Sequence, residues 1–346
     1  MKILIAGLGS IGRRHLRNLI ALGEKDIVLY RTHQSTLPDD DLGDFPVVND
    51  LEAGLDLHPD AVIVSNPTAL HLETAIPALR AGCHIFLEKP VSHSLEGIPE
   101  LQTAQRSGGG QIFVGYQFRF HPGLRKVKAL LSEADSLSAA QGPGIGRPLS
   151  VRAHWGEYLP GWHPWEDYRG GYSARKDLGG GVILTLCHPL DYLCWLLGEV
   201  ESVWAFTGHL NDLNLDVEDT AEIGLRFDNG LLGSVHLDYN QQPPAHFLEI
   251  IGTLGTIRWT NDTGNVHLYQ AQTNAWEVFP TSAAFKRNDL FLAEMEHFLK
   301  VVRRQATPLC SLDDGVRALR IALAARESGG TERLVHPNHL RITPSQ

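Results

Sequence analysis

The sequence has few of the features by which exported, membrane-embedded and metal-binding proteins are recognised. Its 346 residues contain only four cysteines, and none of them forms a C-x-x-C pair or stands at a spacing typical of metal ligands. We therefore expect buried thiols in a reducing compartment and no metal site. No apolar run approaches the roughly 20 residues that a membrane-spanning helix needs, so we expect no membrane association.

The sequence also lacks an excess of basic residues. Lysine and arginine number 30 against 40 aspartates and glutamates, which gives a formal net charge of −10, so a large basic surface for nucleic acid is not expected. Met1 and Lys2 are followed at once by an apolar strand, which leaves no room for an export signal. These absences predict a cytoplasmic protein, and the length predicts two domains.

What the sequence does contain is a glycine-rich turn close to its start. The apolar run Ile3–Ala6 leads directly into Gly7–Gly12, and a helical pattern follows over residues 11–22. A strand, a turn with the spacing G-x-G-x-x-G and a helix are together the fingerprint of a dinucleotide-binding unit. The motif alone is weak, but here the strand precedes it and the helix follows it.

Each glycine of this turn has a separate expected role. Gly7 permits the tight turn, Gly9 lets the backbone approach a pyrophosphate, and Gly12 lets the helix pack close to the strand. The helix begins near Ser10 and Ile11, where N–H groups and the positive end of the helix dipole attract an anion. The turn therefore predicts the phosphate-binding part of a dinucleotide site.

Short apolar strands alternate with helices through the first third of the chain. This order predicts parallel pairing with right-handed crossovers, and hence a doubly wound α/β sheet, a Rossmann domain over residues 1–120. Ligands of such sheets bind at the carboxyl ends of the strands. The segments expected there are residues 7–12, 30–32, 65–71, 88–90 and 115–119. The strands are predicted at 3–6, 26–30, 46–48, 61–65, 84–87 and 112–115, with helices at 69–81 and 95–105.

The second part of the chain, residues 121–346, has a different pattern. Strands follow one another directly, and Asp228-Asn229-Gly230 between two of them is a strong hairpin signal. We therefore expect an α+β domain with a mostly antiparallel open sheet. A helix is predicted over residues 181–197, and Trp155–Tyr168 form an irregular aromatic loop. Further strands are predicted at 149–155, 200–207, 220–227, 231–239, 247–251, 256–259 and 266–269, and further helices end at 131 and cover 289–304 and 312–325.

Three groups of residues in these elements suggest chemistry. Lys89 stands at the carboxyl end of a strand and is expected to point into the crevice of the sheet. His188 and Asp191 lie at i and i+3 of the predicted helix and so share a face. The run 115–122 lies at the seam between the domains, where sites for polar small molecules form. The alternatives are a solvated lysine and a histidine with a structural role.

Taken together, these residues resemble the Gfo/Idh/MocA family of oxidoreductases, named after glucose-fructose oxidoreductase, inositol dehydrogenase and rhizopine catabolism. The resemblance implies reversible hydride transfer between a nicotinamide cofactor and a carbinol or keto carbon of a sugar, sugar acid, polyol or nucleotide sugar. It also implies the two domains described above, the second of which would bind substrate and other subunits. The matching segments, in the order that the family has, are Gly7–Gly12, Asn66–His71, Glu88–Pro90, Tyr116–Pro122, Gly179–Gly181 and His188–Asp191.

The resemblance assigns the catalytic roles to Lys89 and His188. Lys89 would polarise or help to deprotonate the hydroxyl, and His188 would relay the proton as a general acid and base. The sequence departs from the family at Leu184, where many members carry an aspartate four residues before the histidine. Asp191 is the expected replacement that orients His188.

The end of the second predicted strand bears on the choice of cofactor. Sites that prefer NAD carry Asp or Glu about 20 residues after the glycines, whereas this chain has Tyr30-Arg31-Thr32. Arg31 would bind a 2′-phosphate, with Thr32 or Ser35 beside it, so NADP is expected in preference to NAD. The alternative is that Arg31 stacks on the adenine. The residues expected to bind the cofactor are Gly7, Gly9, Ser10, Ile11, Gly12, Arg31, Thr32, Ser65, Asn66, Pro67, His71, Glu88, Lys89 and Gln117.

The aromatic loop and several cations bear on the substrate. Side chains that suit sugar rings are Trp155, Tyr158, Trp162, Trp165 and Tyr168, and cations that would hold a carboxylate or phosphate are Arg119, Arg169, Arg175 and Lys176. We therefore expect a sugar acid or nucleotide sugar, with Tyr172 or Tyr158 as an auxiliary acid. The alternative is that the loop is a subunit interface. The residues expected to contact substrate are Lys89, Tyr116, Arg119, Trp162, Tyr172 and His188.

The resemblance leaves other functions open. Some relatives have lost catalysis and act as dinucleotide-sensing regulators, and others act on non-sugar substrates such as dihydrodiols or bilins. The presence of Lys89 and His188 favours an enzyme, whereas the missing aspartate at Leu184 keeps the regulator open. Family analogy also implies a homo-oligomer, a dimer or tetramer, joined through the open face of the second sheet.

Overall fold

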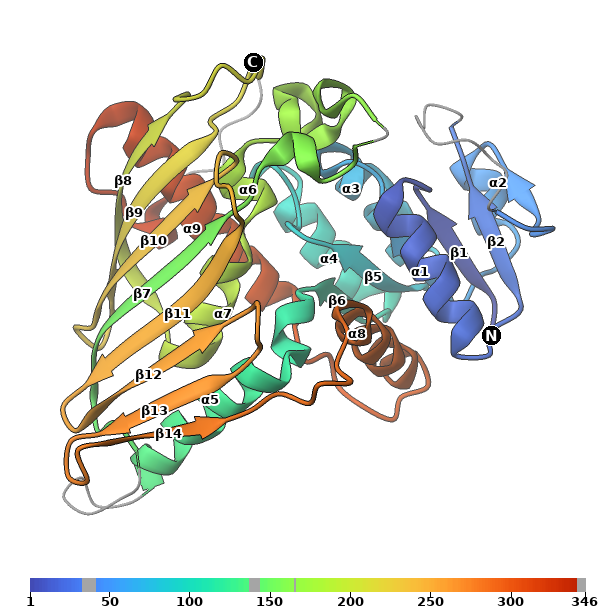
Figure 1. Cartoon of the computed structure of the whole chain (residues 1–346). Helices are drawn as coiled ribbons and strands as arrows, with labels where there is room; N and C mark the ends of the chain where they lie inside the picture. Colours follow the sequence, from blue (N-terminus) through green and yellow to red (C-terminus); the bar gives the residue numbers. More distant parts are fainter. Residues whose placement is uncertain (33–41, 137–143, 165, 341–346) are drawn as a thin grey trace.

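The computed structural model describes residues 1–32, 42–136, 144–164 and 166–340, and Figure 1 shows them as two β-sheets with helices packed around them. The first sheet has six parallel strands in the order β3-β2-β1-β4-β5-β6. The predicted doubly wound parallel sheet is therefore confirmed. Its strands are β1 Ile3–Ala6, β2 Ile27–Tyr30, β3 Val47–Val48, β4 Ala61–Val64, β5 His84–Glu88 and β6 Ile112–Gly115.

The central strands of this sheet are apolar along their whole length. Every residue of β1 and β4 is fully buried, as expected for parallel strands covered on both faces. Helix α1 buries Gly12, Leu16 and Leu19, which lie on one stripe of a helix at i, i+4 and i+7. The helices between these strands are α1 Ser10–Ala21, α2 Leu51–Leu55, α3 His71–Arg80 and α4 Ile98–Gly108.

The second sheet has eight strands in the order β14-β13-β12-β11-β7-β10-β9-β8. All of its pairs are antiparallel except β7 with β10, so the predicted mostly antiparallel sheet is confirmed. The predicted hairpin joins β9 to β10, and Gly230 there has a φ of 83°. The strands are β7 Pro148–Gly156, β8 Val200–Gly208, β9 Thr220–Phe227, β10 Leu232–Asp238, β11 Ala245–Gly252, β12 Gly255–Thr260, β13 Val266–Gln270 and β14 Ala275–Phe279.

Helices cover this second sheet on the face turned toward the first domain (Figure 1). They are α5 Pro122–Ser136, α6 Val182–Thr185, α7 His188–Leu197 and α9 Leu312–Thr331. Short 3-10 turns lie in the connections: η1 Thr68–Leu70, η2 Gln117–Phe120, η3 Leu159–Gly161, η4 Tyr168–Gly170, η5 Tyr172–Ala174, η6 Lys176–Leu178 and η7 Pro337–His339.

The single helix predicted over residues 181–197 is wrong, because the structure breaks it into α6 and α7 at Leu186 and Cys187. The cause is Pro189, which occupies the first turn of α7. Proline has no N–H, so it cannot donate to the carbonyl oxygen four residues earlier, which belongs to Thr185. The break leaves that carbonyl oxygen available to a side chain.

The chain returns to the first sheet near its end. Helix α8, Arg287–Val302, contributes Met295, Phe298 and Leu299 to the same buried cluster as the strands of the first sheet. The ring of Phe298 lies 5.4 Å from that of Phe86 in an edge-to-face arrangement. The division predicted at residue 120 therefore needs one addition, since α8 follows the second sheet in the chain but packs on the first.

In the part of the chain that the structure describes, no single helix is long and apolar enough to cross a membrane. The segments Lys176–Thr185 and His188–Leu197 meet the length and composition criteria only as a pair, which is bent by 47°. The four cysteines are buried and unpaired, as the sequence predicted.

We expect Phe298→Ala to lower the free energy of unfolding by about 3–5 kcal/mol, because it leaves a cavity between α8 and the first sheet. Urea unfolding followed by circular dichroism measures the change. Glu296→Ala, on the exposed side of the same helix, is the matched control and should stay within about 0.5 kcal/mol. Equal losses in the two variants would show that α8 does not belong to this core.

Candidate active site

The site lies at the carboxyl edge of the first sheet. The strand order runs from β1 outward to β3 and then resumes with β4 on the other side of β1, and a crevice opens where the order reverses. The segments that leave β1, β4, β5 and β6 therefore share one edge. All five segments predicted to form the site follow these strands or β2.

The glycine turn has the geometry that the sequence predicted. Gly7 has a φ of 93°, and a Cβ there would lie 2.4 Å from the backbone nitrogen of Asn66. A Cβ on Gly12 would lie 1.9 Å from the carbonyl oxygen of Gly7. Around Gly9, in contrast, nothing lies within 4 Å of such a Cβ. Two glycines are thus required by the protein itself, whereas the space beside the third is open to a ligand.

Helix α1 begins beside this open space without a capping side chain. Its N-cap residue is Gly9, which has no side chain to accept from the first N–H groups, and no acidic residue stands in its first turn. Ser10 and Ile11 are half-buried there. Uncapped N–H groups at the positive end of a helix dipole bind phosphate, so the turn and the helix start fit the pyrophosphate of a dinucleotide.

The turn after β4 completes this edge. The Ser65 hydroxyl donates to the carbonyl oxygen of Gly7 at 2.8 Å, which fastens the two turns together. Asn66 donates to the Thr74 hydroxyl at 3.0 Å, whereas its Oδ1 is buried and has no partner. An unpartnered buried acceptor is costly, so Asn66 fits a ligand that donates a hydrogen bond. Pro67 is half-buried beside it.

His71 was predicted to bind the cofactor, but the structure gives it another role. Its Nδ1 and Nε2 lie 2.9 and 3.0 Å from the carbonyl oxygens of Pro90 and Asn66, and only 1% of the residue is exposed. Burial holds the pKa of His71 below its ordinary value. A neutral imidazole carries one N–H, so one nitrogen donates to one of these carbonyl oxygens while the other nitrogen faces the second carbonyl oxygen. Both nitrogens therefore face the protein backbone instead of open space for a ligand.

Glu88, at the end of β5, is also occupied inside the protein. His15 of α1 donates to its Oε1 at 2.7 Å, and the backbone N–H of Lys89 donates to its Oε2 at 3.1 Å. Burial raises the pKa of Glu88, but the hydrogen bond from His15 and the charge of Lys89 outweigh burial and hold the pKa below its ordinary value. Both carboxylate oxygens of Glu88 are therefore occupied by His15 and by the backbone of Lys89.

Lys89 points across the seam between the domains. Its Nζ donates to the carbonyl oxygen of Thr185 at 2.8 Å, the oxygen that Pro189 leaves free. Burial lowers the pKa of Lys89, but Tyr172, Cys187 and Glu88 together outweigh burial and raise it above its ordinary value. Lys89 therefore stays an ammonium group, with two of its three protons not used by Thr185.

His188 is the first residue of α7, next to this break. It is 2% exposed, and its Nδ1 has no hydrogen-bond partner. Its ring lies among the rings of Tyr116, Phe118 and Trp155, at centroid distances of 5.5, 5.1 and 5.3 Å. Burial, and then the charge of Lys89, hold the pKa of His188 well below its ordinary value. The structure therefore brings together a charged lysine and a neutral histidine.

Asp191 does not orient His188, contrary to the sequence prediction. Both of its carboxylate oxygens accept from Arg119, at 2.7 to 3.2 Å, and the two side chains are 1% and 2% exposed. Arg119 also donates to the carbonyl oxygen of Leu309 at 2.8 Å. Burial lowers the pKa of Arg119, but Asp191 outweighs burial and raises it. Arg119, predicted to hold an anionic substrate, is thus enclosed in a buried ion pair.

Tyr116 is likewise enclosed by the protein. It is fully buried, and its hydroxyl lies 3.5 Å from the Cys187 sulfur. Burial raises the pKa of Tyr116 well above its ordinary value. Tyr116 was expected to touch substrate, but it packs edge-on against His188 instead. Gln117, expected to bind the cofactor, is buried in η2.

The predicted aromatic residues have different surroundings. Tyr172 interacts electrostatically with Lys89, so its expected role as an auxiliary acid stays a prediction. The ring of Trp162 stands edge-on to Tyr239 at 5.6 Å, and its buried Nε1 has no partner. Tyr158 is half-buried and packs against the core. Trp165 lies outside the described residues.

The end of β2 carries the residues predicted to choose the cofactor. Arg31 is 8% exposed, and its backbone N–H donates to the carbonyl oxygen of Val48 at 2.9 Å. Thr32 is exposed. Ser35 lies outside the described residues. No described residue at this strand end is acidic, which fits the predicted 2′-phosphate contact.

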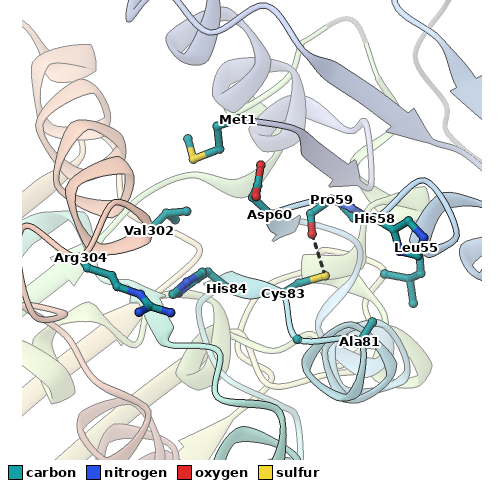
Figure 2. A pocket seen from close by; sticks show the side chains of 11 residues that line it. Met1, Leu55, His58, Pro59, Asp60, Ala81, Cys83, His84, Val302 and Arg304 are labelled. Atoms are coloured by element: carbon teal, nitrogen blue, oxygen red, sulfur yellow. Dashed lines mark hydrogen bonds between the residues drawn. The ribbon is translucent and has the colours of Figure 1, made fainter.

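A cavity of about 530 Å³ lies at the opposite edge of the first sheet (Figure 2). Its lining includes Asp60 and His84, which stand at the amino ends of β4 and β5. Cys83 there donates to the carbonyl oxygen of Pro59 at 3.2 Å, and burial raises its pKa to about 11. This thiol is unreactive at neutral pH, and ligands of such sheets bind at the other edge.

Among the described residues, His154, His236 and Asp238 bring three possible metal-ligand atoms within 4.8 Å of one another. The two imidazole rings are stacked at 4.6 Å with an interplanar angle of 16°, so their lone pairs lie in nearly parallel planes and do not converge on one ion. His236 pairs with Glu222 at 2.6 Å and with Asp238 at 2.9 Å. We therefore interpret the group as an ion-pair network on the open face of the second sheet.

Comparisons with known proteins agree with this geometry. A family described as "Oxidoreductase family, NAD-binding Rossmann fold" matches residues 1–116, and one described as "GFO/IDH/MocA C-terminal domain" matches residues 139–258. The two matches cover most of both sheets.

Individual relatives are similar at low identity. Myo-inositol 2-dehydrogenase of Thermotoga maritima is 28% identical over an alignment of 356 residues, which covers 97% of this chain and 98% of that protein. 1,5-anhydro-D-fructose reductase of Ensifer adhaerens is 27% identical over 279 residues, which covers 79% and 78%. A solved structure of levoglucosan dehydrogenase with NADH and levoglucosan has a TM-score of 0.84 at 22% identity and covers 97% of this chain and 99% of that one. This last likeness concerns the fold.

We expect Asp191→Asn to lower the free energy of unfolding by about 3 kcal/mol, because it breaks a buried ion pair and leaves the Arg119 guanidinium with only the more distant carboxylate of Asp314, at 3.4 Å. Chemical unfolding of the purified variant measures the loss. The matched control is Asp177→Asn, which breaks an exposed pair with Arg175 and should leave the unfolding midpoint unchanged. A stable Asp191→Asn protein that had lost only activity would instead support the original catalytic prediction.

Proposed function

Because this chain belongs to the Gfo/Idh/MocA oxidoreductase family, we propose that it is an NAD(P)-dependent dehydrogenase or reductase that acts on a carbinol or keto carbon of an uncharged sugar or polyol. The observation that carries the proposal is the meeting of Lys89 and His188 at the seam between the domains. Relatives named as inositol dehydrogenase and anhydrofructose reductase support the substrate class.

Lys89 is proposed to polarise the reacting oxygen. Its raised pKa keeps it cationic at neutral pH, so it donates hydrogen bonds and does not act as a base. Thr185 holds it through a neutral carbonyl oxygen, and its charge is therefore not cancelled at that contact. A fixed cation beside an oxygen on which negative charge develops is an effective form of transition-state stabilisation.

His188 is proposed to take the hydroxyl proton. Its lowered pKa keeps the ring neutral at neutral pH, so a ring nitrogen is free to accept. Two titratable groups whose surroundings push their pKa values apart are typical of an acid and base pair. When bound, the nicotinamide accepts or supplies the hydride, and in the reverse direction His188 returns the proton.

An uncharged substrate replaces the sugar acid or nucleotide sugar that the sequence predicted. Arg119 is enclosed with Asp191, and Arg169 and Arg175 pair with neighbouring aspartates, at 3.1 and 2.5 Å. Lys176 lines a hollow together with acidic residues. Since these cations already have anionic partners close by, hydroxyl groups suit the site better than a carboxylate or phosphate.

A homo-oligomer is proposed through the open face of the second sheet. Large apolar side chains stand on this face without a covering helix, and they are 37% to 59% exposed: Trp204, Phe206, Leu232 and Trp276. They lie on β8, β10 and β14 and so extend across the sheet. Exposed apolar area of this extent is typical of an interaction surface, and family analogy supports a second copy as the partner.

We expect the purified protein to reduce NADP⁺ or NAD⁺ in the presence of an uncharged polyol or sugar from a panel that includes myo-inositol, D-xylose and D-glucose. Absorbance at 340 nm measures turnover. D-glucuronate serves as the matched acid of D-glucose and should react more slowly. Lys89→Met should lower kcat by at least about 100-fold, because the cation is lost while the volume is kept.

The control for this experiment is Lys300→Met, on the exposed side of α8, which should leave kcat unchanged. Cofactor affinity in Lys89→Met should stay within about threefold. Full activity of that variant would overturn the role of Lys89. Tight cofactor binding without turnover on any substrate would instead support a dinucleotide-sensing regulator.

NADP is proposed as the preferred cofactor because Arg31 follows β2. We expect Arg31→Ala to weaken NADPH binding by about 10-fold or more through loss of a charge-assisted contact, and NADH binding by no more than about threefold. Fluorescence titration, with the seven tryptophans as energy donors, measures both. Equal losses for the two cofactors would contradict a contact with the 2′-phosphate.

A further inference from the structure

Trp155 stacks with two buried histidines. Its indole ring is stacked with His188 at a centroid distance of 5.3 Å and an interplanar angle of 29°. The His246 ring lies 4.3 Å from the indole and nearly parallel to it, at 3°. Trp155 is 6% exposed and belongs to β7, whereas the two histidines belong to α7 and β11. Three elements of the second domain thus meet in one cluster of rings.

The indole cannot rotate within this cluster of rings without breaking further contacts of its own. Its Nε1 donates to Oε1 of Glu157 at 2.8 Å, which fixes the ring in its own plane. His246 is held in turn, because its Nε2 lies 3.3 Å from the Tyr192 hydroxyl. Phe118 stands edge-on to Trp155 and to both histidines, at 4.9 to 5.4 Å. Trp155 and His246 are therefore each held in place by a polar contact.

Among the described residues, none forms a hydrogen bond with the His188 ring that would fix its orientation. Its Nδ1 is buried without a partner, and a catalytic histidine is ordinarily oriented by a hydrogen bond at the nitrogen that does not react. The position four residues earlier is Leu184, which is fully buried and has no polar atom in its side chain. Asp191 is bound to Arg119. The described surroundings of His188 thus offer ring faces instead of a carboxylate.

We propose that Trp155 is a positioning residue, whose indole face holds the His188 imidazole in its reactive orientation in place of the carboxylate that other family members carry at the position of Leu184. This inference rests on the proposed function, since it assumes that His188 transfers a proton. It goes beyond that function because it assigns a role to a residue that acts through His188.

An indole in place of a carboxylate also changes the electrostatic surroundings of His188. A carboxylate beside His188 would favour the imidazolium form and raise its pKa. The titratable groups that do act on His188 are Lys89 from the end of β5, His246 from β11 and Arg287 from α8, and each of them lowers the pKa of His188, after burial itself. Tyr116 packs against the ring in its neutral form. An aromatic support therefore orients the base and leaves it neutral.

The test is a double-mutant cycle with Trp155→Leu and His188→Asn. With His188 present, we expect Trp155→Leu to lower kcat by about 10- to 100-fold, because a small misplacement of a catalytic group is costly. The KM for the cofactor should change by less than about twofold. In the His188→Asn background the same change should cost no more than about twofold in kcat, because its effect acts through His188.

The pH dependence gives a second readout. Activity requires neutral His188, so it is lost as the pH falls through the pKa of this residue, which burial holds well below 6.5. Trp155→Leu admits water and should raise that pKa toward its ordinary value. The acid limb of the kcat profile should then move to higher pH. A purely structural loss would lower kcat at all pH values without moving the limb.

Two controls complete the experiment. Leu210→Ala removes an apolar side chain that is 75% exposed and should leave kcat and the acid limb unchanged. Should Trp155→Leu fail to fold, Glu157→Leu removes only the tether of the indole and should produce the same changes to a smaller degree. An equal loss of kcat with and without His188, or an unmoved acid limb, would overturn the proposal.

Failure of the proposed function would be recognised separately. If the wild-type protein turned over no substrate, nuclear magnetic resonance of the imidazole nitrogens would still report the pKa of His188. Trp155→Leu should raise that pKa and broaden the His188 signals through ring motion. Unchanged signals in a folded variant would show that Trp155 does not hold His188, whatever reaction the protein catalyses.

Discussion

The hydrogen bond from Lys89 to Thr185 is the contact on which the candidate active site depends. It joins the end of β5 in the first domain to the break between α6 and α7 in the second. The break exists because Pro189 cannot donate to the carbonyl oxygen of Thr185. A single proline therefore ends one helix, places His188 at the start of the next, and exposes the oxygen that receives the lysine. The two proposed catalytic residues are positioned by one local event.

Two buried ion pairs near the seam hold the elements that carry them in place. Glu88 is paired with His15 beneath Lys89, and Arg119 is enclosed with Asp191. Buried pairs of this kind add little net stability but are costly to break, so they fix the relative position of the elements that carry them. Their second effect is to remove charges from the cleft. Lys89 donates to a neutral carbonyl oxygen instead of a carboxylate, which suits a substrate without charge.

The extent to which sequence predicted this arrangement depends on how local each feature is. Gly7, Gly9 and Gly12 carry their roles in their spacing, because strand, turn and helix are consecutive. The buried contacts of Arg119, His71 and Tyr116 were missed, since their partners Asp191, Pro90 and Cys187 come from distant segments that only the folded chain brings together.

The short helix α2 and the exposed strand β14 were missed because neither has a clear hydrophobic period. The break before α7 was an avoidable error, since Pro189 stands within the predicted helix. The packing of α8 on the first sheet has no local signal.

The departure at Leu184 is consistent with the rest of the site. Removing a hydride from a carbinol requires that its hydroxyl proton leaves as well, so the oxygen needs a nearby positive charge and an acceptor for the proton. A carboxylate at position 184 would lie four residues before His188, across the break between α6 and α7, and would add a negative charge next to Thr185, whose carbonyl oxygen binds Lys89. With a leucine there, Lys89 keeps its charge for the substrate, and His188 stays neutral through burial. The cost is that His188 loses a polar anchor, and a ring stacked on a fixed indole is the support that the structure offers in its place.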